Sequence, residues 1–172
     1  MSTHRVSILG PSTIPDSTGE AFFEPYSILA SNDQWRHLII RLGSDNTVQP
    51  TVDHGVYGQF QVPQNYASAA NLVIVWTATL ITGDVEFDFR YRAIGGNDTE
   101  SLDQTTEDED VNLNDTAPSA AHERMELIIA LTDSNFAIGD TVTFFLTRDG
   151  TDAGDTLAGS AILFDAYFEY SN

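Results

Sequence analysis

The 172-residue chain contains no cysteine and no lysine. Without cysteine it can form no disulfide, no thiolate metal site and no cysteine nucleophile, and this absence fits either redox compartment. Its seven basic residues are all arginine and face 26 acidic residues, which gives a net charge of −19. Such a surface repels phosphate backbones and anionic head groups, so we expect neither nucleic acid nor a membrane as a partner.

Long hydrophobic segments are also lacking. No apolar run reaches the roughly 18 residues that a transmembrane helix needs. The first residues, MSTHRVSILGPST, lack the extended hydrophobic region and the cleavage site of a signal peptide. From these absences we expect a soluble protein that is not exported through a cleaved signal.

Alternation of apolar and polar residues dominates the rest of the chain. In DVEFDFRYRA, residues 84–93, every second residue is apolar and the others are mostly charged, as in a half-buried strand. NLVIVWTATLI, residues 71–81, is apolar on both faces and rich in β-branched residues, which is typical of a central strand. The short connection Thr82-Gly83-Asp84 predicts that these two strands form a hairpin.

Six further segments are predicted as strands: residues 125–132, 141–148, 161–170, 34–42, 55–62 and 26–30. SAAHERMELIIAL is the best candidate for a helix, but its isoleucine pair fits a sheet better. Long strands joined by loops of unequal length, with no helices between them, predict two packed antiparallel sheets. We therefore expect an all-β fold, an antiparallel β-sandwich of jelly-roll type with seven to eight strands, and a single helical turn in DSNFAIGD.

Two segments differ in composition from the sandwich. Residues 1–34 contain three prolines and little periodicity, so we expect an extended N-terminal arm followed by a β-sandwich domain over residues 35–172. Residues 95–120 hold eight acidic residues and no basic ones, which is typical of a solvated loop insertion within that domain.

The stretch RDGTDAGD, residues 148–155, resembles a calcium loop at first sight. Asp149, Asp152 and Asp155 lie three apart, and calcium favours closely spaced carboxylates. The spacing of an EF-hand is absent, because that motif needs acids at alternate positions and a distant glutamate. Two interpretations stay open: a solvated turn between strands, which we favour, and a structural Ca²⁺ site formed by these three aspartates. We expect no other cofactor.

Glu86 and Asp88 are the best candidates for catalysis. Carboxylates two residues apart on one strand face serve in glycoside hydrolases with sandwich folds. The third carboxylate of laminarinase-like enzymes is missing, because this face continues with Arg90 and Arg92, and we expect Asp88 to pair with Arg90 instead. The four histidines stand singly, and no serine-nucleophile, phosphate-loop or dinucleotide motif occurs. The sequence therefore predicts that the protein is not an enzyme.

Aromatic residues supply the candidate contacts with partners. Trp76 lies in the most apolar segment and is predicted to be in the core. Phe22, Phe23 and Tyr26 cluster in the proline-rich arm, where they would either anchor the chain on a partner or pack under its own sandwich. Trp35 is predicted to lie either in the core or in an interface.

The carboxyl-terminal half has a distinctive order of segments: VIVWTAT, GDVEFDFRYRAI, an acidic loop, MELIIALT and GDTVTFFLTRDGTDAGDTLAGSAILFDAYFEY. This order resembles a recurring β-sandwich of tailed-phage virion structural proteins, which include capsid decoration (cement) proteins and head or tail appendages. The resemblance spans roughly residues 70–170, whereas residues 1–69 match nothing comparable. It brings no catalytic residues with it.

The resemblance implies a capsid decoration protein on the outer surface of a phage head, in the virion. There it would clamp neighbouring major capsid protein subunits and assemble with copies of itself, which we expect as a homotrimer. The alternative is a carbohydrate-binding module of a tail or receptor-binding appendage, or of a cell-surface adhesin. A carbohydrate-binding module requires an exposed aromatic row on a concave sheet, whereas a decoration protein requires contact with a shell protein.

Overall fold

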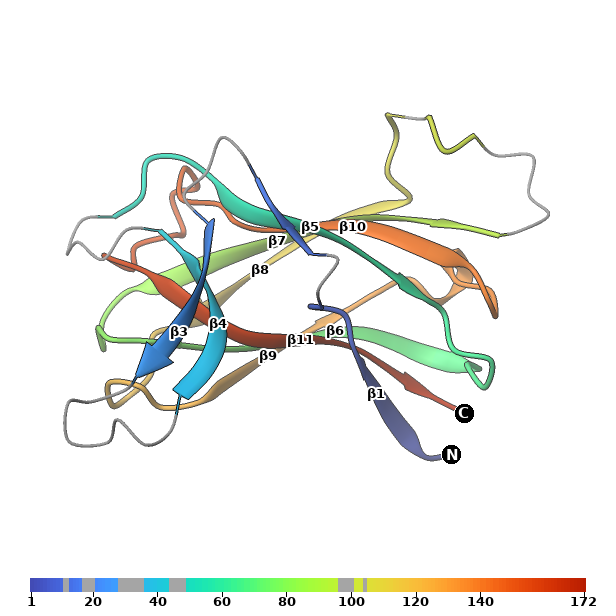
Figure 1. Cartoon of the computed structure of the whole chain (residues 1–172), viewed down its shortest axis with the longest axis horizontal. Helices are drawn as coiled ribbons and strands as arrows, with labels where there is room; N and C mark the ends of the chain where they lie inside the picture. The colour runs from blue at the N-terminus through green and yellow to red at the C-terminus, as the bar shows by residue number, and fades with distance from the viewer. Residues whose placement is uncertain (11–12, 17–20, 28–35, 44–48, 96–100, 104) are drawn as a thin grey trace.

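The computed structural model describes residues 1–10, 13–16, 21–27, 36–43, 49–95, 101–103 and 105–172, without the side chains of residues 22, 24–27 and 36. The described strands form two antiparallel sheets that stack face to face (Figure 1). This arrangement confirms the prediction of an all-β antiparallel sandwich. The described residues form eleven strands, and all eight predicted segments overlap one of them.

Sheet A has the strand order β3-β4-β11-β6-β9. Strand β1 pairs with residues 167–171 of β11, while β4 pairs with residues 161–163 of the same strand. A register shift between Leu163 and Asp165 separates these two halves of β11. The strands of sheet A are β1 (Thr3–Ser7), β3 (Ala21–Ser27), β4 (Arg36–Leu42), β6 (Ser68–Ala78), β9 (Met125–Ala130) and β11 (Ala161–Ser171).

Sheet B has the strand order β2-β5-β10-β7-β8 and forms the upper layer in Figure 1. The two-residue strand β2 pairs only with residues 56 and 57 of β5, so the rest of β5 has no partner on that side among the described residues. The strands of sheet B are β2 (Ile14–Pro15), β5 (His54–Gln61), β7 (Asp84–Ile94), β8 (Glu109–Thr116) and β10 (Thr141–Arg148).

The core lies between the sheets and consists of the inward residues of each strand. Phe87 and Phe89 of β7 are fully buried, as their alternation predicts, and the burial of each such side chain is worth about 1.5–3 kcal/mol. Trp76 of β6 is also fully buried, which confirms the prediction that it belongs to the core. Its ring meets Phe87 edge to face, with 5.6 Å between ring centroids. The core therefore joins β6 of one sheet to β7 of the other.

The predicted hairpin of these two strands is wrong. β6 is central in sheet A, between β11 and β9, whereas β7 lies in sheet B between β10 and β8. The connection through Gly83 crosses from one sheet to the other, because each strand has an apolar face that is buried against the opposite sheet. A short loop with turn residues does not distinguish a hairpin from such a crossing.

Two segments that were predicted to lack regular structure, the loop insertion and the N-terminal arm, contain β-strands. Within the expected loop insertion 95–120, residues Glu109–Thr116 form β8 and pair with β7 along their whole length. Within the expected N-terminal arm 1–34, three strands, β1, β2 and β3, pair with β11, β5 and β4. Edge strands need only one neighbouring strand and little apolar periodicity, so composition did not reveal them.

Helical structure is minimal in the described part of the chain. The 3₁₀ turn Asp133–Asn135 confirms the predicted helical turn. The side chain of Asp133 accepts hydrogen bonds from the backbone N–H groups of Ala69 and Ala70, which ties this turn to the start of β6. Over the residues described, no helix is long and apolar enough to cross a membrane.

Candidate functional site

The outer face of sheet B carries a row of paired side chains that crosses four strands. Tyr57 of β5 lies opposite Phe145 of β10, which lies opposite Arg90 of β7, which lies opposite Asp110 of β8. Residues paired directly across an antiparallel sheet point to the same face, so the four side chains form one continuous row. Their neighbours along each chain, such as Val56 and Leu146, point into the core.

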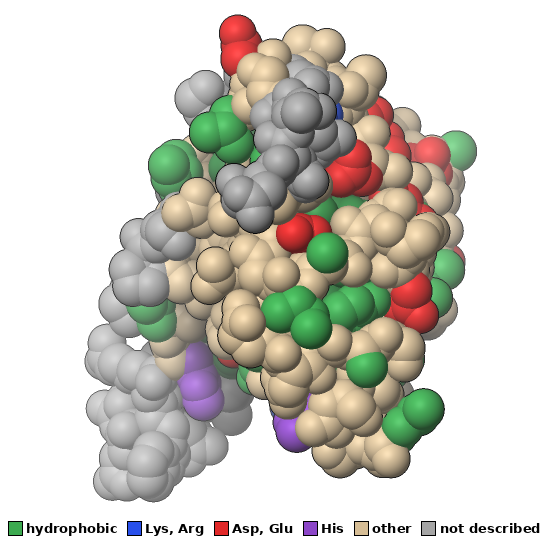
Figure 2. All heavy atoms as spheres, turned by 90° about the vertical axis from the view of Figure 1, so that its right-hand side faces the viewer, with side chains coloured by type: hydrophobic (Ala, Val, Ile, Leu, Met, Phe, Trp, Pro, Cys, Tyr) green, Lys and Arg blue, Asp and Glu red, His purple; other side chains and the backbone are tan. Residues whose placement is uncertain are grey.

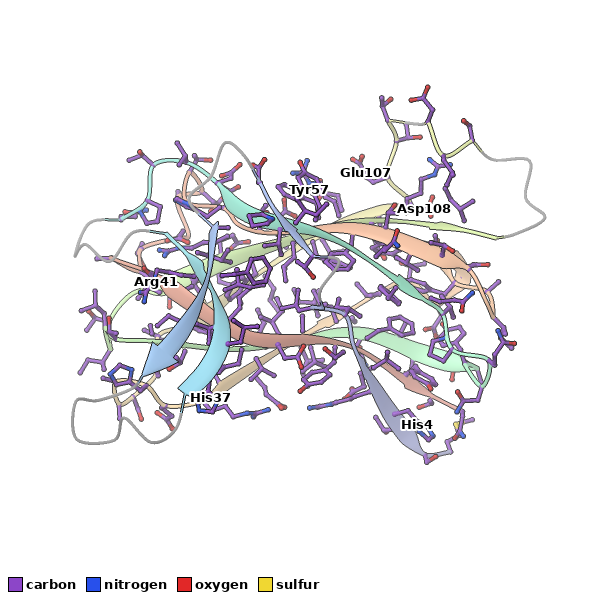
Figure 3. The ribbon with its side chains drawn as sticks, viewed as in Figure 1. His4, His37, Arg41, Tyr57, Glu107 and Asp108 are labelled. Carbon is purple, nitrogen blue, oxygen red and sulfur yellow. The ribbon has the colours of Figure 1, made fainter. Side chains whose placement is uncertain are left out.

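Tyr57 and Phe145 form a stacked aromatic pair on this face. Their ring centroids lie 4.2 Å apart and the ring planes differ by 19°. Tyr57 remains 47% exposed, although an aromatic ring of this size is usually covered. Phe145 lies between Tyr57 and Arg90 in this row, and the guanidinium of Arg90 lies 5.1 Å from the centroid of the Phe145 ring. Figure 3 shows Tyr57 on the outer surface of sheet B, away from the core.

Beside the aromatic pair the sheet presents polar, uncharged side chains. Gln59 lies opposite Thr143 and Gln61 lies opposite Thr141, and all four are exposed. Amide and hydroxyl groups both donate and accept hydrogen bonds. Together with the aromatic pair they form a floor that is flat, partly apolar and rich in neutral hydrogen-bonding groups.

A groove of about 1040 Å³ lies over this floor. The sheet supplies one wall, and described residues of the connection from β7 to β8 supply the other. In Figure 1 the described part of this connection rises above sheet B. The described residues of that connection that line the groove are Gly95, Leu102, Thr105, Thr106 and Glu107. Leu102 is 81% exposed, which leaves an apolar group above the floor for a ligand to contact.

Specific hydrogen bonds hold this connection against the sheet. Arg92 donates from Nη1 to the carbonyl oxygen of Thr106 at 2.7 Å and lies close to its hydroxyl at 3.4 Å. Asp108 accepts a hydrogen bond from the backbone N–H of Ala93 at 2.8 Å. These contacts fix the part of the loop that borders the groove, and Figure 3 shows Glu107 and Asp108 beside the sheet.

Glu109 anchors the end of the same loop below the groove. Its carboxylate accepts hydrogen bonds from the hydroxyl of Tyr91 at 2.5 Å and from the backbone N–H and hydroxyl of Thr132 at 2.9 and 2.8 Å. Burial opposes ionisation, but these hydrogen bonds outweigh it and lower the pKa of Glu109. The acidic run 107–110 is therefore partly a structural element, which its composition did not indicate.

Several carboxyl groups lie close together near Arg90 and Asp110 on this face of sheet B. Burial raises the pKa of Asp88 to about 7, and a hydrogen bond that the protonated Asp88 donates to Asp110 adds to this shift. Burial and a hydrogen bond to Asp149 likewise raise the pKa of Asp53. Arg90 lies 3.7 Å from Asp88, which confirms the expected ion pair. Figure 2, which views the end of the molecule, shows Asp and Glu side chains around the sheet B half and scarcely any basic atoms.

The two carboxyl groups that sequence analysis singled out for catalysis lie on this face but in different surroundings. Glu86 is only 4% exposed, and burial, together with the charges of Asp152, Asp149 and Asp155, raises its pKa. Asp88 lies nearer the groove and contacts Arg90 and Asp110. Glu86 is therefore shielded from the groove floor, and the pair does not present two accessible carboxylates side by side.

The structure does not bring Asp149, Asp152 and Asp155 together as a metal-binding group. Among the described residues, no group of three or more histidine, aspartate or glutamate side chains is arranged to hold a metal ion. Asp149 accepts hydrogen bonds from Thr151 and from the N–H of Asp152, and Asp152 accepts one from the N–H of Gly154. Two of the three aspartates therefore stabilise the turn itself.

Asp155 instead forms a buried ion pair with Arg148. The guanidinium of Arg148 also donates to the carbonyl oxygens of Leu157 and Gly159. The loop thus folds around an internal cation that the chain supplies, and Asp155 is paired with this arginine. Sequence analysis missed Arg148 because it considered only the acidic residues of the loop.

Three of the predicted interface residues, Phe22, Phe23 and Tyr26, belong to strand β3 at the edge of sheet A. Phe23 is 41% exposed and lines a smaller cavity of about 480 Å³ together with Leu38 and Phe164. Phe22 and Tyr26 belong to β3 by their backbone, and their side chains lie outside the described part of the structure. Trp35 also lies outside the described residues. The predicted role of these residues in an interface remains a prediction.

Comparison with known proteins gives a fold likeness without a family. No family model matches the chain, and no curated protein matches it. Among solved structures, it is similar to a family 35 carbohydrate binding module from Clostridium thermocellum, with a TM-score of 0.52 and 13% identity, covering 98% of this chain and 99% of that one. It is also similar to a CBM35 structure from Paenibacillus barcinonensis, with a TM-score of 0.51, 10% identity and full coverage of both chains. At these identities the likeness shows the sandwich fold alone.

Proposed function

We propose that the protein is a non-catalytic carbohydrate-binding module that holds a glycan in the groove on the outer face of sheet B. The observation that carries this proposal is the exposed ring of Tyr57, stacked on the half-buried Phe145, beside a floor of amide and hydroxyl groups. The C–H face of a sugar ring packs on an aromatic ring, and its hydroxyl groups need donors and acceptors close by. The exposed aromatic side chain on a sheet face is one part of the feature that we expected of such a module, which was an exposed aromatic row on a concave sheet.

The size of the groove supports an oligosaccharide ligand. Sites for small molecules usually measure about 300–1,000 Å³. The groove, at about 1040 Å³, is slightly larger than this range, and it runs towards the part of β5 that has no partner strand among the described residues. A chain of sugars could therefore extend over this edge of the sheet.

The fold likeness agrees with the proposal but does not carry it. The two similar structures are described as carbohydrate-binding modules, and both extend over nearly the same length as this chain. One fold supports many functions, so the groove and not the likeness supports carbohydrate binding.

The carboxyl groups near the groove support a binding role. Hydrolysis of a glycoside needs two carboxyl groups on opposite sides of the scissile bond. Asp88 and Asp110 instead contact each other across neighbouring strands, and Glu86 is buried. We therefore expect bound oligosaccharides to remain uncleaved, which chromatography of the products after prolonged incubation would check.

The location of such a module in a phage virion, on the head or on the tail, stays a prediction. The resemblance of the sequence to tailed-phage virion proteins predicts either a carbohydrate-binding appendage or a head decoration protein, and the fold likeness to carbohydrate-binding modules favours the former. The copy number in purified particles distinguishes these places, because head decoration implies hundreds of copies and a tail appendage implies few.

The test of the proposed function is binding to a glycan array, followed by calorimetry with the best ligand. Replacing Tyr57 with alanine should weaken binding about tenfold or more, because the sugar loses its packing surface, and tenfold corresponds to about 1.4 kcal/mol. Ile128→Ala is the matched control, since Ile128 has a similar exposed fraction of 48% but lies in β9 of the other sheet. Equal affinities of the wild-type protein and the Tyr57 variant would reject the groove as the binding site.

A further inference from the structure

Resting on the proposed function, we infer that the groove selects neutral glycans and rejects polysaccharides that carry carboxylate or sulfate groups. The relevant observation is how its two arginines are used. A site for an acidic sugar needs a cation that can face the ligand, usually an arginine that binds a carboxylate through two hydrogen bonds. Arg90 and Arg92 are the only basic residues among the described residues that line the groove.

Arg92 is engaged by the protein itself. It is 9% exposed, and its Nη1 atom donates to the carbonyl oxygen of Thr106 at 2.7 Å. This hydrogen bond holds the loop that forms the upper wall. The guanidinium of Arg92 is therefore directed at the loop and not at the groove. A ligand that bound Arg92 instead would break the contact that holds the wall.

Arg90 is surrounded by acidic groups. It lies 3.7 Å from Asp88 in its own strand, is paired in register with Asp110, and stands over the ring of Phe145. Asp88 donates its proton to Asp110 in a hydrogen bond, so the carboxyl pair with its shared proton carries one negative charge, which offsets the single charge of the guanidinium. An anionic ligand would have to compete with this carboxyl pair for the same positive charge.

The rest of the groove adds negative charge and neutral polar groups. Glu107 lines the upper wall. Asp149 lies near Asp88, and Asp53 lies next to Asp149. The whole chain carries a net charge of −19, so an acidic polymer is also repelled at long range, over about 8 Å at physiological salt. The exposed polar groups of the floor beside the aromatic pair are the amides of Gln59 and Gln61 and the hydroxyls of Thr141 and Thr143, which bind sugar hydroxyls without a charge requirement.

The inference is tested with pairs of soluble polysaccharides that share a backbone and differ in charge. Suitable pairs are hydroxyethyl cellulose and carboxymethyl cellulose, and β-1,4-mannan and mannuronan, measured with the full chain by affinity electrophoresis and calorimetry. For at least one pair, we expect the neutral member to bind about tenfold or more tightly than the acidic member. Raising the salt concentration should leave the affinity for the neutral member nearly unchanged, because no charge pairing contributes to it.

A variant that removes negative charge from the groove makes the test sharper. Glu107→Gln together with Asp110→Asn should narrow the ratio of affinities between the neutral and acidic members, whereas Glu126→Gln in β9 of sheet A should leave the ratio as it is. Equal or tighter binding of an acidic member by the wild-type protein overturns the inference but leaves carbohydrate binding intact. If no member of any pair binds and the glycan array is also empty, the proposed function fails, and this inference fails with it.

Discussion

Arg148 and Asp155 form a fully buried ion pair joined at two points. Nε of the arginine lies 2.7 Å from Oδ2 of the aspartate, and Nη2 lies 2.7 Å from Oδ1. Both side chains are 0% exposed. The same aspartate accepts a hydrogen bond from the backbone N–H of Glu86, so the pair connects the end of β10, the following loop and β7.

Removing the carboxylate of this pair should strongly destabilise the fold. Asp155→Ala leaves the guanidinium of Arg148 buried without its counter-ion, and breaking a buried pair in this way costs about 3–5 kcal/mol. Chemical denaturation followed by the fluorescence of the tryptophans measures this loss. The surface pair of Arg124 and Glu126 is the control: Arg124→Ala should cost less than about 1 kcal/mol, because its side chain is 58% exposed. Equal losses for the two variants would contradict the structural role of the buried pair.

The stability of the protein should fall as the pH rises through about 7. Asp88 has a pKa of about 7 in the fold, against 3.8 for an ordinary aspartate, so between these values the folded state binds more protons than the unfolded state. The contribution of this group is complete below about pH 4 and is lost as the pH rises through 7. We expect a lower melting temperature at pH 8 than at pH 5.5, by about 2–4 °C for each kcal/mol lost.

Asp88→Asn isolates this effect, because an amide does not titrate. The variant should lose much of the pH dependence near pH 7, while Asp103→Asn, at an exposed position in the loop, should keep it. Melting curves recorded across this pH range provide the measurement. An unchanged slope in the Asp88 variant would show that another group is responsible.

Arg92 should control the mobility of the groove wall. Arg92→Met keeps an apolar stem of similar length but removes the hydrogen bond to the carbonyl oxygen of Thr106, so the described residues 105–108 should exchange their amide hydrogens faster. Hydrogen exchange with mass spectrometry measures this rate, and glycan affinity should fall with it. Arg124→Met on the other sheet should affect neither quantity.

Gly83 is required by the crossing between the sheets. Its φ of +100° is unfavourable for other residues, and a Cβ atom there would lie 2.6 Å from the carbonyl oxygen of Thr156. Gly83→Ala should therefore cost about 1–3 kcal/mol. Gly10→Ala is the matched control, since no atom lies within 4 Å of its Cβ position, and it should change the free energy of unfolding little. Denaturant titration of both variants decides this point.

The alternation of apolar and polar residues was sufficient to predict the fold class and most strands. The segments that became β7, β10 and β11 follow a period of two, and burial of one face of each is required wherever that face is apolar. Trp76 was placed in the core on the same grounds. The short helical turn after β9 was also predicted correctly.

The groove could not be predicted in this way, because it depends on which strands become neighbours. The alternation in β5 predicts that Tyr57 and Gln59 share a face. It does not predict that β10 is the neighbouring strand, which places Phe145 next to Tyr57. The same limit explains the wrong hairpin of β6 and β7, since a turn sequence does not determine whether the chain stays in one sheet. Long-range pairing is decided by the burial and hydrogen bonding of the whole sandwich.

The acidic loop of residues 148–155 shows what local sequence determines and what depends on long-range packing. The local sequence established a tight acidic turn after β10, and the turn is present. Whether its last aspartate would bind a metal ion or an arginine depended on the position of Arg148, whose guanidinium is enclosed by the loop carbonyls and by Asp155. The amino acid sequence thus defined two layers of strands with an acidic exterior. Only the packing of those layers determined which residues come into contact, because contacts between distant segments form only when the complete core is buried.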